Sequence, residues 1–214
     1  DTLRLTDALN DADGTRPAFA QPVLSDLSTR LRDADWSVRV ALHCDSIEGG
    51  EACREVVGII RRDSPVVGLA VDIGTTKVAA YLVDLETGRT LAKSGLMNPQ
   101  IAYGEDVVSR IKYANEHRDG REVLQTRLIE GLNLLVGQLC EDAGVEREQV
   151  VDAVVVGNTA IHHLFTGLPV TQLGASPYIA AVSESLNLRA DTLGLELAPG
   201  ARVYLPPNIA GYVG

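Results

Sequence analysis

The sequence contains few aromatic residues and has no excess of positive charge. Only 4% of its 214 residues are Phe, Trp or Tyr, so aromatic platforms for stacking bases or sugar rings are not expected to dominate its surface. The formal net charge is −10, from 19 Lys and Arg against 29 Asp and Glu. Because a phosphate backbone is neutralised by clustered Lys and Arg, this balance excludes nucleic acid as the expected partner. A single nucleotide is not excluded, since backbone N–H groups and Mg²⁺ can hold its phosphates.

Cysteine is also scarce, and long hydrophobic runs are missing. Cys44, Cys53 and Cys140 match no spacing of zinc or iron–sulfur ligands, so we expect free thiols in a reducing compartment. No run of about 18 apolar residues predicts a membrane span. Residues 1–7 have neither the basic start nor the apolar stretch of a signal peptide. The expected location is therefore the cytoplasm, with no membrane partner.

The first 66 residues predict a small α/β unit. Residues 1–19 are polar and contain a turn signal at Asp11–Gly14. The charged, proline-terminated link over 61–65 marks a domain boundary, which gives a first domain over 1–66. Within it, the periodicity of apolar residues predicts a helix over 22–34 and strands over 36–42 and 56–60.

The remaining residues, 67–214, predict a larger α/β domain. Three apolar segments separated by turn residues favour an antiparallel meander. Two helices follow, and the second repeats leucine along one face and should end at Gly144. A buried strand that leads into a further helix completes a mixed α/β layer fold. The expected elements are strands over 66–71, 77–83, 89–95 and 152–156, and helices over 105–117, 121–142 and from Ala160 onward.

The clearest chemical signal lies at the tip of the first predicted hairpin. Gly74 lets the backbone approach a ligand closely, and the N–H groups of Gly74, Thr75 and Thr76 can point into one space and bind phosphate. Asp72 ends a buried strand, and its carboxylate can hold Mg²⁺ through the waters of the ion. Lys77 follows the turn and either joins the phosphate site or faces the sheet. The alternative is an ordinary Asp-x-Gly turn, but the apolar strand before it and the two hydroxyls after it favour the phosphate site.

A second candidate lies where the strand over 152–156 ends. Gly157, Asn158 and Thr159 stand at a strand-to-helix junction, where free backbone N–H groups favour anions. Capping of the helix by Asn158 or Thr159 is an alternative of equal weight. No catalytic residue is indicated by either segment.

Two further pairs have simpler interpretations. His162 and His163 are adjacent on a helix and point about 100° apart, so they do not easily share a metal. One should pack inward while the other caps the helix or faces water. Asp106 and Arg110 are four residues apart on the helix over 105–117 and should form a solvated or subunit-facing ion pair.

Four stretches of the sequence together resemble a known protein family. Gly68–Lys77 resembles the first phosphate motif of the superfamily of acetate and sugar kinases, heat-shock chaperones and actin. Asn98–Ile111, Val156–His163 and Leu205–Gly214 are similar to one branch of it, the reductive activators of corrinoid proteins. This resemblance implies an actin/sugar-kinase-type fold.

The resemblance also implies how the chain is divided and what it lacks. Residues 1–66 would be the middle or linker domain, and 67–214 the first, ribonuclease H-like half of the ATP-binding domain. Members of the family also have a [2Fe–2S] ferredoxin domain, whereas this sequence has no Cys-x₅-Cys-x₂-Cys loop. The half of the nucleotide site that covers adenosine is absent as well. We therefore expect a piece of a longer protein that alone is inactive and binds ATP weakly or not at all.

The function implied by the resemblance is ATP-dependent reduction. The intact protein would pass an electron from its [2Fe–2S] cluster to the Co(II) corrinoid protein of a methyltransferase system and so produce Co(I). ATP and Mg²⁺ would bind at the candidate residues named above, no cofactor would be held tightly by this chain alone, and the intact protein could form a homodimer. A small-molecule kinase of the same superfamily and a non-catalytic actin-like interaction module remain alternatives.

Overall fold

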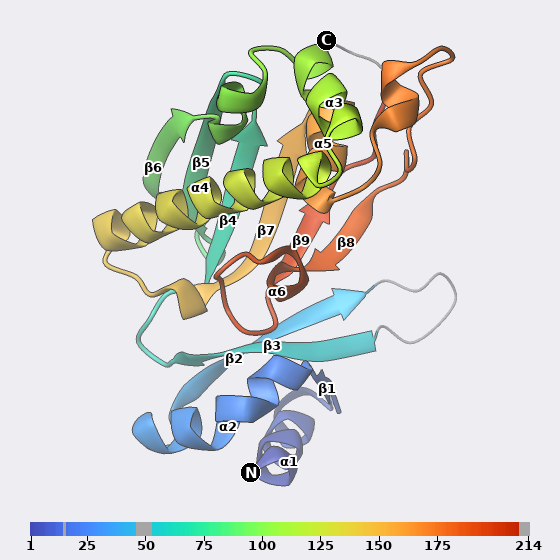
Figure 1. Ribbon diagram of the computed structural model, residues 1–214. Coiled ribbons are helices and arrows are strands. Elements are labelled where there is room, and N and C mark those ends of the chain that lie inside the picture. Colours follow the sequence, from blue (N-terminus) through green and yellow to red (C-terminus); the bar gives the residue numbers. More distant parts are fainter. Residues whose placement is uncertain (15, 46–52, 210–214) are drawn as a thin grey trace.

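The computed structural model describes residues 1–14, 16–45 and 53–209, and these form two β-sheets (Figure 1). The smaller sheet has the strand order β1-β3-β2, and the larger has the order β6-β5-β4-β7-β9-β8. No helix in these ranges combines the length and the apolar composition that crossing a bilayer needs.

The smaller sheet comes from the first part of the chain. β3 (Cys53–Arg61) lies in its centre, parallel to β1 (Ala18–Phe19) and antiparallel to β2 (Val38–Asp45). α2 (Gln21–Asp33) packs on this sheet, as the helical spacing of its apolar residues predicts. The buried side chains of α2 are Val23, Leu27 and Leu31.

The first residues form a helix where the sequence predicts a polar segment with a turn. α1 spans Thr2–Asp13 and ends at Gly14, whose φ of 74° is the left-handed conformation of a helix C-cap. Leu5 is buried against the cluster of α2 and β3, and Leu9 packs beside it. The prediction was wrong because these two leucines supply most of the apolar face, which is too little to stand out among polar neighbours.

The larger sheet confirms the predicted meander and extends it. β4, β5 and β6 are antiparallel neighbours, β7 and β9 continue the sheet parallel to β4, and β8 closes the edge antiparallel to β9. The strands are β4 (Val67–Ile73), β5 (Lys77–Asp84), β6 (Thr90–Met97), β7 (Val150–Gly157), β8 (Leu186–Arg189) and β9 (Arg202–Leu205). β8, at the edge, and its neighbour β9 are short strands with no counterpart in the sequence prediction.

Three helices lie on one face of the larger sheet (Figure 1). They are α3 (Val107–Glu116), α4 (Gly120–Ala143) and α5 (Thr159–Thr166). The predicted leucine stripe of α4 is buried, and Gly144 ends the helix with a φ of 64°. Alternate residues on the strands point to the other face, where several large apolar side chains stay exposed. These are Tyr81, Val154, Val156 and Tyr204.

Short helical turns connect these elements. They are η1 (Pro99–Tyr103), η2 (Arg147–Gln149), η3 (Thr171–Gly174) and α6 (Ala190–Leu193).

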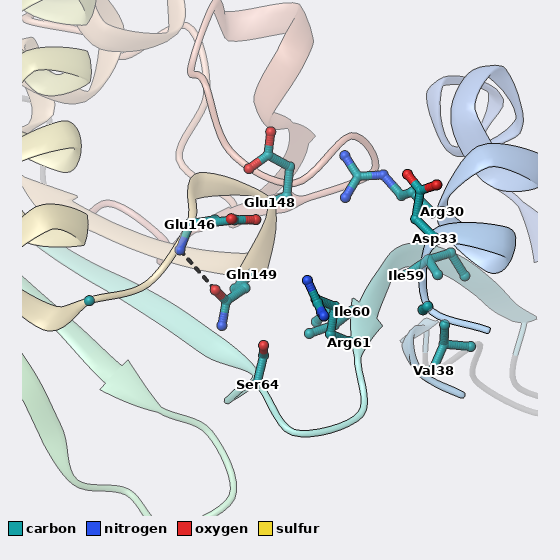
Figure 2. A pocket seen from close by; sticks show the side chains of 12 residues that line it. Arg30, Asp33, Val38, Ile59, Ile60, Arg61, Ser64, Glu146, Glu148 and Gln149 are labelled. Carbon is teal, nitrogen blue, oxygen red and sulfur yellow. Dashed lines mark hydrogen bonds between the residues drawn. The ribbon is translucent and has the colours of Figure 1, made fainter. Parts of the chain in front are cut away.

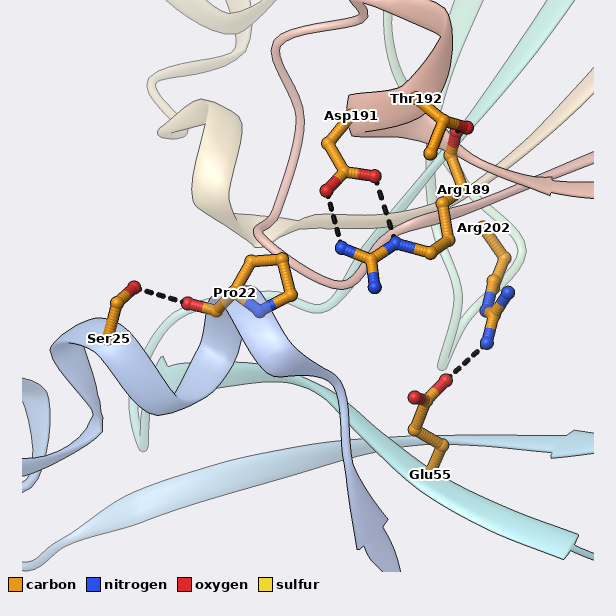
Figure 3. A network of polar contacts seen from close by, with 7 residues as sticks. All are labelled: Pro22, Ser25, Glu55, Arg189, Asp191, Thr192 and Arg202. Atoms are coloured by element: carbon orange, nitrogen blue, oxygen red, sulfur yellow. Dashed lines mark hydrogen bonds and ion pairs between the residues drawn. The ribbon is translucent and has the colours of Figure 1, made fainter.

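The two sheets meet along β3. Gly200 donates its N–H to Val57 O at 2.9 Å, and a Cβ at Gly200 would lie 2.6 Å from Val57 Cα, so only glycine fits there without movement. Glu55 and Arg202 form an ion pair across the junction, near the Arg189–Asp191 pair (Figure 3). The main core includes buried residues of both sheets. The division of the chain into domains over 1–66 and 67–214 stays a prediction.

A cavity of about 420 Å³ also lies at this junction (Figure 2). Its lining carries both signs of charge, for example Arg30 and Arg61 with Glu146 and Glu148. These residues lie near the start of β7, which pairs with the start of β4, whereas the phosphate hairpin follows the end of β4. The cavity is therefore at the opposite end of the sheet from the candidate site.

Candidate functional site

The predicted phosphate hairpin is the turn between β4 and β5. Asp72 lies between the buried Val71 and Ile73, so its carboxylate stands on the exposed face of the sheet, opposite the helices. Its neighbours across the sheet are Ala79 on β5 and Val156 on β7. The carboxylate is therefore open to a ligand at the end of a buried strand.

The turn itself is tight. A Cβ added at Gly74 would lie 2.7 Å from the carbonyl oxygen of Lys77, which is backbone and cannot swing aside. Glycine is thus needed for the two sides of the hairpin to close, in addition to any approach of a ligand. Lys77 begins β5 with an exposed side chain, opposite Met97 in β6.

The carbonyl groups of the turn accept hydrogen bonds from two buried residues that follow β6 in the chain. Asn98 is 1% exposed, and its Nδ2 donates to Gly74 O at 2.9 Å while its backbone N–H donates to Thr76 O at 2.9 Å. Arg110 is 0% exposed, and its Nη2 donates to Thr75 O at 2.6 Å.

The prediction that Asp106 and Arg110 form a solvated ion pair is wrong because Arg110 is buried, although the two charges attract each other. The Arg110 guanidinium is buried, and its other hydrogen bonds run from Nε to Gly104 O at 2.9 Å and from Nη1 to Gln100 Oε1 at 3.5 Å. Burial lowers the pKa of Arg110 from its usual value. Asp106 instead caps α3, accepting the Ser109 N–H at 2.7 Å, which lowers the pKa of its carboxyl.

The second predicted segment lies beside the first. Gly157 ends β7 next to Ile73 of β4, because the two strands are parallel neighbours. Asn158 caps α5 by accepting the Ile161 N–H at 2.9 Å, which confirms the capping interpretation. The same side chain reaches the hairpin, with Nδ2 at 3.4 Å from Thr75 Oγ1. Thr159 is 5% exposed.

Both histidines of α5 are buried, so the prediction that one of them caps or faces water is wrong. Both ring nitrogens of His163 have hydrogen-bond partners: Nδ1 lies 2.7 Å from Thr159 O, and Nε2 accepts the Ala181 N–H at 3.0 Å. The short helix is covered on two adjacent sides, by the sheet and by the segment around Ala181. That second cover comes from a stretch in which the sequence shows no periodic element.

His162 lines a cavity of about 300 Å³ at the start of α5. It is 5% exposed, and neither ring nitrogen has a hydrogen-bond partner. Burial, together with the neighbouring His163, lowers the pKa of His162 to about 4, so the ring is neutral at pH 7. The rest of the lining is mainly apolar and comes from β7, α5 and residues 206–209.

The site offers one carboxylate for a divalent cation. No group of three or more His, Cys, Asp or Glu that could hold a metal lies within the described ranges. Mg²⁺ commonly binds through one or two carboxylates together with substrate phosphates and waters. Asp72 at the edge of the hairpin fits that pattern, with the phosphates supplying the remaining negative charge.

Comparison with known proteins identifies the family. Residues 67–214 match the family described as the RACo middle region. The chain belongs to this family. RamQ, a corrinoid activation enzyme of Eubacterium limosum, is 33% identical over 153 residues, which are 72% of this chain and 26% of RamQ. A solved structure of a reductive activator for a corrinoid, iron–sulfur protein is 35% identical with a TM-score of 0.79, covering 100% of this chain and 34% of that one.

The similarity to this solved reductive activator, together with the family match, confirms the predicted fold and the predicted family of reductive activators of corrinoid proteins. An archaeal actin homologue in complex with ADP is a distant match at 15% identity and a TM-score of 0.29, too low to support an argument. The chain spans about a quarter to a third of the length of these activators. The family model that matches residues 67–214 is itself named for a middle region. Our assignment of residues 1–66 as a middle or linker domain stays a prediction.

Proposed function

We propose that this chain is the phosphate-binding part of an ATP-dependent reductive activator of a corrinoid protein. The observation that carries the proposal is the hairpin after β4. The carbonyl groups of its three turn residues accept hydrogen bonds from Asn98 and Arg110, and Asp72 is exposed beside it. Both activators found by comparison act on corrinoid proteins by their names, which supports the same kind of partner here.

In this proposal the chain's own residues bind the phosphates and orient the cation. The N–H groups of Gly74, Thr75 and Thr76 donate to phosphate oxygens, and Lys77 adds a positive charge at the rim. Asp72 holds Mg²⁺ through its waters; the ion neutralises phosphate charge when bound. Gly157, Asn158 and Thr159 approach the same phosphates from the neighbouring strand, with Asn158 already in contact with Thr75.

The remaining steps belong to the whole protein. A [2Fe–2S] domain donates one electron, which reduces the Co(II) corrinoid of a methyltransferase system to Co(I). Phosphate contacts at the hairpin differ between open and closed forms of the complete cleft, so ATP shifts the population toward the form in which transfer occurs. We place the protein in the cytoplasm and allow for a homodimer.

The kinase alternative has less support. A kinase needs a carboxylate over its substrate, and the cavity beside α5 has none among its described lining residues. Asp191, one of the acidic residues further along, is paired with Arg189 at the sheet edge.

The proposal is tested on the full-length protein with its Co(II) corrinoid partner and a chemical reductant. We expect the absorbance of Co(I) to develop with Mg-ATP and to be largely lacking with Mg-ADP or without nucleotide. Equal amounts of Co(I) in all three reactions would show that ATP has no part in the activation.

A further inference from the structure

Asn98 and Arg110 control which way the hairpin backbone faces. The peptides that join Gly74 to Thr75 and Thr75 to Thr76 are trans, so each N–H points opposite to the carbonyl of its own peptide. Since the carbonyls of Gly74 and Thr75 point at Asn98 and Arg110, the N–H groups of Thr75 and Thr76 point away from them. No backbone carbonyl in the described chain accepts from either N–H.

The charge of Arg110 acts in the same direction. Arginine stays protonated in proteins, and the buried guanidinium of Arg110 is attracted by the Asp106 carboxylate but donates its hydrogen bonds to other oxygen atoms. A buried cation whose direct contacts are mainly carbonyl oxygens is costly to maintain. Its hydrogen bond to Thr75 O polarises the peptide whose N–H belongs to Thr76, which makes that N–H a stronger donor to an anion.

Asn98 and Arg110 are both linked to α4 through Gln100. Gln100 is 0% exposed, accepts a hydrogen bond from Arg110, and donates its Nε2 to Leu124 O of α4 at 3.1 Å. Its backbone N–H donates to Asn98 Oδ1 at 2.9 Å. The two residues that bind the hairpin carbonyls are therefore fixed in place by hydrogen bonds that lead to α4.

We propose that Asn98 and Arg110 are positioning residues for the phosphates of a bound nucleotide. They turn two N–H groups of the hairpin toward the ligand and place a buried positive charge one peptide behind it. This inference rests on the proposed ATP site and adds to it two residues that contact the hairpin and not the nucleotide.

The test compares Mg-ATP with adenosine, which has no phosphates, by calorimetric titration of the full-length protein. Arg110→Met is expected to raise the Kd for Mg-ATP at least about tenfold, because the Thr76 N–H is no longer oriented and polarised and the positive charge behind the phosphates is lost, while the Kd for adenosine stays unchanged. Arg110→Lys keeps the charge and should recover part of the loss. Arg127→Met, on the exposed side of α4, is the matched control and should bind both ligands like the wild type.

Asn98→Asp provides a second variant if Arg110→Met does not fold. It keeps the acceptor for the Gln100 N–H and replaces the donor to Gly74 O by a repelling oxygen, so Mg-ATP binding should again be lost selectively. Folded variants with the wild-type Kd for Mg-ATP, or with equal losses for Mg-ATP and adenosine, would overturn the inference. A wild-type protein that binds no Mg-ATP would instead overturn the proposed function and this inference with it.

Discussion

Replacing Asp72 by asparagine is expected to lower Mg-ATP turnover by the full-length protein by about 10- to 100-fold, the usual effect of removing a group that holds a metal through its waters. The carboxylate stands exposed at the end of β4, beside the hairpin that we assign to the phosphates. Asparagine keeps the size of the side chain and removes its charge. The loss should appear mainly as a higher Mg²⁺ requirement, and a steady-state assay at increasing Mg²⁺ measures it.

The control for this variant is Asp142→Asn. Asp142 is an exposed carboxylate near the end of α4, at the opposite end of the sheet from the hairpin. The same chemical change there should leave turnover and its Mg²⁺ dependence unaltered. If Asp72→Asn and Asp142→Asn behave alike, Asp72 has no part in holding the ion.

Acidification from pH 6.5 to 4 is expected to cost the folded protein about 3 kcal/mol of unfolding free energy through His162 alone. The ring is buried without hydrogen-bond partners, and its pKa is lowered from 6.5 to about 4. Between these values the unfolded chain binds a proton that the folded chain does not. Stability is therefore unaffected by His162 above pH 6.5 and falls as the pH drops toward 4.

His162→Leu should remove most of this dependence, and at neutral pH it should be no less stable, because it deletes two unpaired buried nitrogens. His163 has a pKa that is also lowered by burial, and it leaves a residual slope in the variant. His117→Leu, at an exposed histidine, should keep the wild-type slope. Denaturant unfolding between about pH 7 and pH 4.5 measures the difference; an unchanged slope in His162→Leu would refute the assignment.

The parts of the fold that follow from local patterns were predictable. The leucine stripe of α4, its glycine C-cap at Gly144 and the meander of β4 to β6 each depend on residues close together in the sequence. α1 and the short strands β8 and β9 were not predicted. α1 has too few apolar residues to show a period, and the four-residue strands β8 and β9 are defined by pairing with distant segments.

The candidate site divides in the same way. The two segments that were expected to face a phosphate lie side by side, because each follows one of two parallel neighbouring strands. The role of Arg110 was not predictable from its spacing with Asp106, since its partner carbonyl lies 35 positions earlier in the chain. An arginine on an amphipathic helix such as α3 gives no sequence signal that it is buried. Only the tertiary fold shows what it contacts.

Hydrogen exchange of the full-length protein with and without Mg-ATP tests most directly whether the hairpin binds the phosphates. The N–H groups of Thr75 and Thr76 point to the proposed ligand, so peptides covering residues 72–77 should exchange more slowly when Mg-ATP is bound. Peptides from β2 in the smaller sheet should show no change. Unaltered exchange over residues 72–77 in a protein that demonstrably binds Mg-ATP would contradict the assignment, because the phosphates would then be held elsewhere.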